Sequence, residues 1–116
     1  MRPFEYHQAK SIENALESYY SNTHYLGGGT NLIDLMKEDV ERPKCLIDIN
    51  QLENNEVKTA EDGSLVLGAM MSNSDTANHK EVRKKYPLLS MAMLAAASAQ
   101  IRNMATNGGN LLQRTR

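Results

Sequence analysis

The sequence has no tryptophan, one phenylalanine and one cysteine. Because aromatic side chains are so few, Leu, Ile, Met and Ala have to fill the core. The lone thiol, Cys45, has no partner for an internal disulfide, and it lies in an apolar run typical of a strand. We therefore interpret Cys45 as a buried, inert residue and expect a reducing, cytoplasmic environment.

Long hydrophobic runs and an excess of one charge are absent as well. The most apolar run, residues 88–99, is too short to span a bilayer, and the first residues lack the apolar segment of a signal peptide. With 13 Lys and Arg against 14 Asp and Glu, the total charge does not point to nucleic acid or a membrane surface. The basic run at residues 80–85 fits a solvated helix face better than a phosphate-binding patch, because no aromatic residues are interleaved with it.

Glycine, by contrast, is concentrated in three consecutive positions at residues 27–29. They stand between an apolar run ending at Leu26 and a helix-like run starting at Leu32, which predicts a strand, a tight loop and a helix N-terminus. Such a loop lets a ligand approach the backbone, and the free N–H groups of the helix attract anions. Thr30 or Asn31 is expected to cap the helix. A structural turn and a phosphate cradle are about equally supported, since the run matches neither a dinucleotide fingerprint nor a Walker loop.

The first fifty residues have the pattern of a small parallel α/β unit. Residues 3–7 suit an edge strand, and Ser11 is a candidate N-cap for an amphipathic helix. The apolar face of that helix has helical spacing: Ile12, Ala15, Leu16 and Tyr19. A strand ending at Leu26, a helix over residues 31–37 and a strand over residues 45–49 then predict a right-handed crossover between parallel strands. Ligands of such units bind at the carboxyl ends of the strands, where the glycine loop lies.

After residue 50 the pattern becomes antiparallel. Asp62-Gly63 between two β-rich runs predicts a hairpin, and we place a subdomain boundary near Leu52. Ser72 or Ser74 is expected to cap a short helix through His79, and the chain restarts at Tyr86-Pro87. Residues 88–102 are apolar on nearly all sides, which predicts one buried helix.

A second glycine element, Thr106-Asn107-Gly108-Gly109-Asn110, follows the predicted helix. A glycine-rich helix C-cap followed by a turn explains these residues. The alternative is that this element and the glycine loop contact opposite sides of one ligand. Asp48 follows a predicted strand, and two interpretations are possible for it: a functional residue, or a residue that caps the next turn. His7, His24 and His79 are scattered, and we interpret them as surface or packing residues, so no metal site is predicted.

Three stretches carry a resemblance to a known family. They are residues 27–32 (GGGTNL), residues 67–69 (LGA) and residues 100–116 (QIRNMATNGGNLLQRTR). In these the chain resembles the flavin-binding medium subunit of the molybdenum hydroxylases, the family of xanthine dehydrogenase, carbon monoxide dehydrogenase and aldehyde oxidoreductase. The similarity runs along essentially the whole chain, and its last stretch is long and specific.

The resemblance implies an α+β fold of the FAD-binding type shared with vanillyl-alcohol oxidase and p-cresol methylhydroxylase. In this interpretation residues 1–52 are a small βαβ-containing FAD-binding subdomain. Residues 53–116 are the first part of a second subdomain built on a larger antiparallel sheet, with FAD between the two. The fold is incomplete in this interpretation, because family members continue well beyond the position of Arg116.

The resemblance also implies which residues bind FAD. The pyrophosphate would be held by the glycine loop and its flanks: Leu26, Gly27, Gly28, Gly29, Thr30, Asn31 and Leu32. The phosphate and ribitol side would be met by the second element: Thr106, Gly108, Gly109 and Asn110. The flavin would be bordered by three further residues: Gly68, Ala69 and Ile101.

Electron transfer is the function that the resemblance implies. Electrons would come from iron–sulphur clusters of a [2Fe–2S] subunit, fed by a molybdenum-cofactor subunit, and leave through FAD to NAD⁺, a quinone, oxygen or another acceptor. The redox chemistry belongs to the cofactor, so no catalytic residue is expected in this chain. The alternatives are a non-redox nucleotide-binding or assembly module, and an inactive truncated fragment that oligomerises.

Two departures from the family bear on these expectations. Relatives usually have Val or Ile where this chain has Asn107, which would loosen the packing or contact the cofactor differently. In some relatives a cysteine follows the Gln-Arg-Thr-Arg run, and no such cysteine is present here. We expect an N-terminal portion of a longer flavoprotein, with weak or absent FAD binding by a lone chain and with unpaired strand edges that favour self-association.

Overall fold

The computed structural model describes residues 1–115 and divides the chain into two compact units. The first comprises Met1–Glu53 with the last residues from Gln113 onward, and the second comprises Asn54–Leu112. None of the helices in residues 1–115 has the length and hydrophobicity needed to cross a bilayer.

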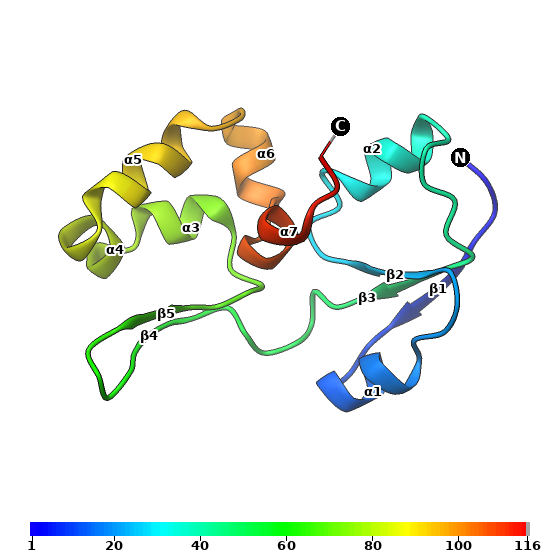
Figure 1. Ribbon diagram of the computed structural model, residues 1–116, viewed down its shortest axis with the longest axis horizontal. Helices are drawn as coiled ribbons and strands as arrows, with labels where there is room; N and C mark the ends of the chain where they lie inside the picture. The colour runs from blue at the N-terminus through cyan, green and yellow to red at the C-terminus, as the bar shows by residue number, and fades with distance from the viewer. Residues whose placement is uncertain (116) are drawn as a thin grey trace. The chain divides into compact units, whose positions relative to one another are not determined.

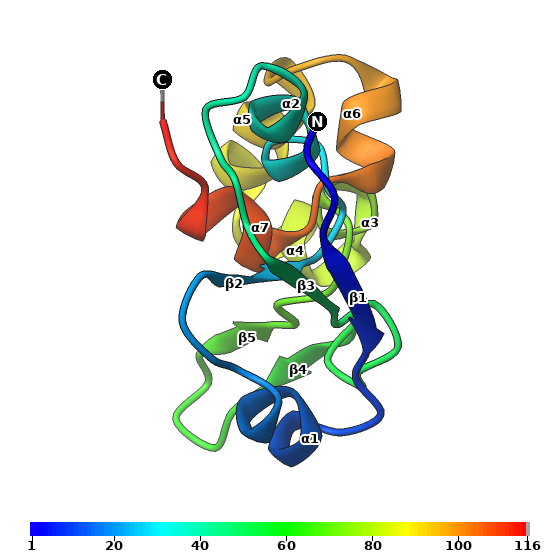
Figure 2. The ribbon, with the colours of Figure 1, turned by 90° about the vertical axis from the view of Figure 1, so that its right-hand side faces the viewer.

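The first unit is built on a parallel three-stranded sheet in the order β1-β3-β2. Its strands are β1 (Glu5–Gln8), β2 (Thr23–Leu26) and β3 (Cys45–Asp48), and Figure 2 shows β3 between the other two. Helices α1 (Ile12–Glu17) and α2 (Leu32–Lys37) lie on opposite faces of the sheet (Figure 1). The predicted parallel strand–helix–strand arrangement is confirmed. Gln8 and Leu26 both pair with Asp48, so all three strands end at one edge.

The core of this unit lies on both faces of β3, and all four residues of that strand are buried. Cys45 and Ile47 pack with Ala9 and with Ala15 of α1. This follows from the position of β3, because a central strand covered by helices on both sides has no face left for solvent. The buried thiol predicted for Cys45 is confirmed, since the residue is 0% exposed.

Helix α1 is shorter and less buried than its sequence pattern predicts. The Ser11 hydroxyl caps it, accepting from the Asn14 N–H at 3.1 Å. The helix ends at Glu17, however, and Ala15 is its only buried residue. Ile12 and Leu16 remain 57% and 64% exposed. Helical spacing thus identified the apolar face, but in the described structure only its smallest side chain reaches the core.

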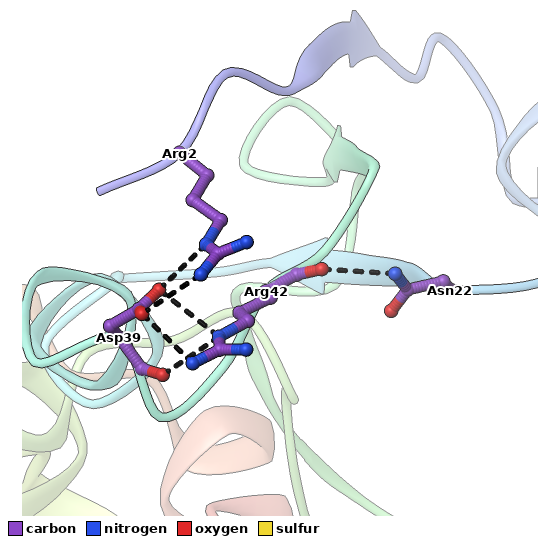
Figure 3. A network of polar contacts seen from close by, with 4 residues as sticks. All are labelled: Arg2, Asn22, Asp39 and Arg42. Carbon is purple, nitrogen blue, oxygen red and sulfur yellow. Dashed lines mark hydrogen bonds and ion pairs between the residues drawn. The ribbon is translucent and has the colours of Figure 1, made fainter.

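The far end of α2 is fixed by an ion-pair network around Asp39 (Figure 3). Asp39 has a positive φ of 58° and accepts from Arg2 Nε at 3.0 Å and from Arg42 Nη2 at 2.9 Å. The Asn22 side chain donates to the Arg42 carbonyl at 2.9 Å, which connects the turn before β2 to the same network. Hydrogen bonding to Arg2 is the largest factor that lowers the pKa of Asp39.

The second unit begins with an antiparallel hairpin of β4 (Val57–Thr59) and β5 (Leu65–Leu67). Gly63 has a φ of 83°, which a glycine adopts without strain, and the Asp62 carboxylate accepts from the Ser64 N–H at 2.9 Å. The hairpin predicted from Asp62-Gly63 is therefore confirmed.

Within residues 1–115, five short helices follow the hairpin: α3 (Asn73–Asn78), α4 (Lys80–Lys85), α5 (Pro87–Ala95), α6 (Ala99–Met104) and α7 (Asn107–Leu112). Ser72 caps α3, accepting from the Asp75 N–H at 3.0 Å, as predicted. The predicted restart at Tyr86-Pro87 is also confirmed, with Pro87 in the first turn of α5.

The prediction of one buried helix over residues 88–102 is wrong in two respects. The chain leaves the helix after Ala95, and Ala97 has a φ of 52°. The alanines favour a continuous helix, but capping contacts stabilise a break. Ser98 caps the start of α6, and Arg102 Nη1 donates to the Ala97 carbonyl at 2.8 Å.

The second error concerns burial. Ser90 is the only buried residue of α5, and its hydroxyl donates to the Ala77 carbonyl at 2.6 Å. Leu88 and Met91 are 78% and 67% exposed. The apolar composition of this segment therefore does not correspond to burial within the described part of the chain.

Candidate functional site

The glycine loop lies at the carboxyl end of β2 and leads directly into α2. Gly29 has a φ of 76°, and a Cβ on it would stand 3.1 Å from Ile33 Cγ1. A side chain at this position would therefore be both strained and crowded. The Gly29 carbonyl accepts from the Ile33 N–H at 3.1 Å, which starts the first turn of the helix.

Six consecutive N–H groups of this loop are available for a ligand. Within residues 1–115, no carbonyl or side-chain oxygen accepts from the backbone N–H groups of the residues Gly27, Gly28, Gly29, Thr30, Asn31 and Leu32. The three glycines are partly exposed and Thr30 is exposed. Neither predicted cap is observed: Asn31 makes no side-chain cap bond, and its Nδ2 donates to the Arg114 carbonyl at 3.2 Å. Unpaired N–H groups at a helix start favour an anion.

Asp48 and Asn50 connect the glycine loop to the sheet. Asn50 Nδ2 donates to the Gly27 carbonyl at 3.0 Å and to Asp48 Oδ1 at 2.7 Å. The same carboxylate oxygen accepts from the Asn50 N–H at 2.8 Å, and the Tyr6 hydroxyl donates to the other oxygen. Asp48 thus caps the turn after its strand, which was one of the two roles considered from the sequence. Through Asn50 it also positions the loop.

The electrostatics of Asp48 follow from these contacts. Burial opposes its charge, since the residue is 8% exposed, but the hydrogen bonds from Tyr6 and Asn50 outweigh burial and lower the pKa of Asp48. The reciprocal hydrogen bond raises the pKa of Tyr6. A carboxylate held in its charged form keeps the Asn50 amide oriented toward the Gly27 carbonyl.

In the second unit, the second glycine element is the start of α7 and not a C-cap followed by a turn. Thr106 is its cap: its hydroxyl accepts from the Gly109 N–H at 3.1 Å, and its carbonyl accepts from the Asn110 N–H at 2.8 Å. A Cβ on Gly109 would stand 2.9 Å from the Thr106 hydroxyl. The glycine here makes room for the cap.

The structure brings Gly68 and Ala69 next to this element. The Gly108 N–H donates to the Ala69 carbonyl at 2.8 Å, and a Cβ on Gly108 would be 3.2 Å from that oxygen. Gly68 is buried, and a Cβ on it would overlap the Asn54 carbonyl oxygen at 2.5 Å. Ile101 lies on α6 with its side chain 46% exposed.

Asn107 is a buried polar residue of the second unit. It is 8% exposed, and its Nδ2 donates to the Gly68 carbonyl at 3.0 Å and to Thr76 Oγ1 at 2.8 Å. Thr76 is itself 0% exposed. A buried side-chain pair with these contacts has no simple sequence signal, because its members are 31 positions apart.

The two glycine elements therefore differ in what they offer. In the second element the N–H groups of residues 107–110 are all used within the unit: they donate to Met71, Ala69 and Thr106. In the glycine loop, the N–H groups of residues 27–32 have no acceptor in the described part of the chain. A parallel strand–loop–helix unit with free N–H groups, followed by an antiparallel unit, is typical of an α+β nucleotide-binding protein.

Comparison with known proteins identifies the family. Residues 2–116 match the family described as the FAD binding domain in molybdopterin dehydrogenase. The chain therefore belongs to this family, and the resemblance drawn from the sequence is confirmed.

The relatives include an FAD-binding subunit and the medium chain of a dehydrogenase. The aldehyde oxidoreductase FAD-binding subunit PaoB of Escherichia coli (strain K12) is 45% identical over 118 residues, which cover 100% of this chain and 37% of the relative. The carbon monoxide dehydrogenase medium chain of Hydrogenophaga pseudoflava is 35% identical, over 93% of this chain and 39% of the relative. The chain thus spans about two-fifths of the length of these curated relatives.

Solved structures confirm the fold class. Carbon monoxide dehydrogenase from Hydrogenophaga pseudoflava, in a form that lacks the Mo-pyranopterin moiety, matches with a TM-score of 0.88 at 35% identity, over 95% of this chain and 39% of that one. Quinoline 2-oxidoreductase from Pseudomonas putida 86 matches with a TM-score of 0.88 at 26% identity, over 95% and 39%.

Proposed function

We propose that this chain is the FAD-binding portion of a molybdenum hydroxylase flavoprotein subunit, in which FAD passes electrons from iron–sulphur clusters to NAD⁺ or another acceptor. The single observation that carries the proposal is the row of six glycine-loop N–H groups without an acceptor among residues 1–115, in a chain of the FAD-binding family. FAD contains a pyrophosphate, and consecutive backbone N–H groups at a helix start are suited to that anion.

In this proposal the glycine loop of the first unit binds the pyrophosphate. Gly27, Gly28 and Gly29 leave the backbone uncovered, and Asn50 holds the loop by the Gly27 carbonyl. Thr30, Asn31 and Leu32 supply the last three N–H groups, and Leu26 ends the strand that presents them.

The second unit has a different role in this proposal. Because the N–H groups of residues 107–110 are already used, the proposal gives this element a packing role beside FAD, at the exposed start of α7 around Gly109. Thr106 and Asn110 flank those glycines, and Gly68 and Ala69 are packed against them. We assign Ile101, with its partly exposed apolar side chain, to the flavin surface.

FAD supplies the redox chemistry, and the chain binds, orients and shields it. The partners in this proposal are a molybdenum-cofactor subunit and a [2Fe–2S] subunit of the same complex. Support comes from relatives that are medium chains or FAD subunits of dehydrogenases, including carbon monoxide dehydrogenase and nicotinate dehydrogenase.

A second candidate is a non-redox nucleotide-binding module. One observation favours it: the loop N–H groups without an acceptor among residues 1–115 all belong to the first unit. Such groups suit a phosphate and do not require a flavin ring. ADP would then bind as tightly as FAD.

A titration of FAD with the purified chain, followed by flavin fluorescence and anisotropy, tests the proposal. ADP serves as the competitor. Gly29→Ala adds a Cβ at a φ of 76°, 3.1 Å from Ile33, and is expected to weaken binding at least about tenfold. Gly63→Ala is the matched control, since its φ is 83° but nothing lies within 4 Å of the added Cβ.

The outcomes separate the candidates. Saturable FAD binding that ADP displaces only weakly, and that Gly29→Ala impairs while Gly63→Ala does not, supports the flavin proposal. Equal affinity for ADP supports the non-redox module. A folded chain that leaves FAD fluorescence and anisotropy unchanged rules out a competent FAD site in this chain.

A further inference from the structure

Glu5, His7 and Cys45 form a side-chain cluster that the proposed FAD role does not use. The His7 imidazole, the Glu5 carboxylate and the Cys45 sulphur each offer a ligand atom, and these atoms all lie within 4.8 Å of one another. The cluster lies within the first unit, on one face of its sheet.

The strand pairing produces this cluster. Glu5 of β1 pairs with Cys45 of β3 in parallel register, so both side chains point to the same face. His7 is two residues beyond Glu5 and shares that face, because side chains alternate along a strand. The central strand β3 therefore fixes the position of the buried Cys45 sulphur. The edge strand β1 supplies the exposed His7 imidazole and Glu5 carboxylate.

The three donors suit one class of metal ion. A thiolate, an imidazole and a carboxylate are together the ligands of Zn²⁺ and of ions with similar preferences, such as Co²⁺. Donor atoms around tetrahedral Zn²⁺ lie roughly 3.5 Å apart, given metal–ligand distances near 2.0–2.3 Å. His7 Nε2 and Glu5 Oε2 are 3.8 Å apart, and the sulphur of the buried Cys45 lies within 4.8 Å of both, so a bound ion would draw the two exposed side chains toward the sulphur.

Tyr20 makes a hydrogen bond to one member of the cluster. Its hydroxyl donates to Glu5 Oε2 at 3.0 Å. Metal-ligating carboxylates are typically held by such a second hydrogen bond, which orients the remaining oxygen lone pairs.

We propose that Glu5, His7 and Cys45 bind one Zn²⁺-class ion at the β1–β3 edge of the sheet, leaving a fourth position for water or an external ligand. Binding replaces the Cys45 S–H bond by a sulphur–metal bond and releases the proton to solvent. The site does not depend on FAD, so its test and the FAD titration succeed or fail separately.

Co²⁺ titration of the purified chain tests the proposal, because a thiolate–Co²⁺ bond has a charge-transfer band and tetrahedral Co²⁺ has strong visible bands. We expect both bands at one Co²⁺ per chain and their loss when Zn²⁺ is added. His7→Ala and Glu5→Gln are each expected to raise the Co²⁺ dissociation constant at least about tenfold. Both side chains are exposed, so these variants keep the fold, whereas Cys45→Ser alters a core residue.

His24→Ala is the matched control. His24 Nε2 lies 3.9 Å from Glu41 Oε2 in the same unit, a pair like His7 and Glu5 but outside the set that includes the thiol. It is expected to leave Co²⁺ binding unchanged. The proposal is overturned if the wild-type chain shows no charge-transfer band, if the band survives both His7→Ala and Glu5→Gln at unchanged affinity, or if His24→Ala weakens binding as much as His7→Ala.

Discussion

The buried pair of Asn107 and Thr76 gives a quantitative test of how the second unit is held together. Asn107→Val introduces a residue type that is usual at this position in the family that the sequence resembles. In this chain the change removes a side-chain amide that donates to the Thr76 hydroxyl and to the Gly68 carbonyl. The Thr76 hydroxyl, in a residue that is 0% exposed, then loses its side-chain partner. The Gly68 carbonyl keeps one donor, the Met71 N–H at 3.2 Å.

The expected cost follows from these contacts. A buried polar group left without a partner costs about 1–3 kcal/mol, and the Gly68 carbonyl, which keeps a donor, adds less. We expect Asn107→Val to lower the free energy of unfolding by about 2 kcal/mol. For a unit of this size that corresponds to roughly 8–16 °C in Tm. Thermal and urea unfolding followed by circular dichroism measure both quantities.

A double-mutant cycle isolates the pair. Thr76→Val removes the hydroxyl at nearly constant volume, and the combined variant leaves neither partner unsatisfied. Replacing both partners by apolar groups costs much less than the sum of the two single changes, so we expect a coupling of at least about 1 kcal/mol. Strict additivity, or an Asn107→Val variant as stable as the wild type, would refute the reasoning.

Three further predictions concern single positions. Gly68→Ala is expected to destabilise the second unit by about 1–3 kcal/mol in urea unfolding, because its Cβ would overlap the Asn54 carbonyl oxygen at 2.5 Å. Ala97→Gly is expected to be neutral or to stabilise the protein by up to about 1 kcal/mol, because glycine adopts a φ of 52° without strain. Ala92→Gly, inside α5, is expected to destabilise it by about the same amount. Equal effects of the two variants would contradict the end of the helix at Ala95. The pKa of Asp48 is lowered from 3.8 in the fold, so its charge stabilises the protein above about pH 4 and this contribution is lost as the pH falls through the lowered value. Asp48→Asn is expected to flatten acid unfolding in that range, and an unchanged profile would contradict the assigned hydrogen bonds.

Local signals predicted the elements whose geometry is decided locally. Ser11 and Ser72 cap their helices, Asp62-Gly63 forms the hairpin turn, and the apolar run at Cys45 is the buried central strand. In each case the residues that determine the structure lie within a few positions of it. The parallel pairing followed as well, because a short strand–helix–strand sequence has few other solutions.

The predictions were wrong where contacts between distant residues, or competing helix caps, determine the structure. Nothing in the composition of residues 88–102 predicts a break at Ala97, since alanine is the best helix former. The break depends on Arg102, whose guanidinium binds the Ala96 and Ala97 carbonyls, and on the Ser98 cap. Burial was misjudged for a related reason: an apolar segment is buried only if other residues cover it, and Leu88 remains 78% exposed.

The candidate site also combines features that local sequence predicts with features that depend on distant contacts. The strand–loop–helix geometry of the glycine loop was predicted from the sequence, because three glycines between an apolar run and a helix have few structural uses. Asn50, which holds the Gly27 carbonyl, was not, because its partner is 23 positions away. Nor did the sequence reveal that Tyr6, on the edge strand, donates to Asp48.

The two glycine elements show why a motif alone does not define an anion site. Both contain consecutive glycines at the start of a helix, where the first N–H groups have no partner within the helix itself. In α7, however, the Asn107 and Gly108 N–H groups donate to the carbonyls of Met71 and Ala69, which the β5–α3 connection brings to the helix start. No such segment reaches the N–H groups of the glycine loop among residues 1–115. The capacity to bind an anion is therefore set by what the rest of the fold leaves unpaired, and it makes Gly29, not Gly108, the position at which an added Cβ most directly tests phosphate binding.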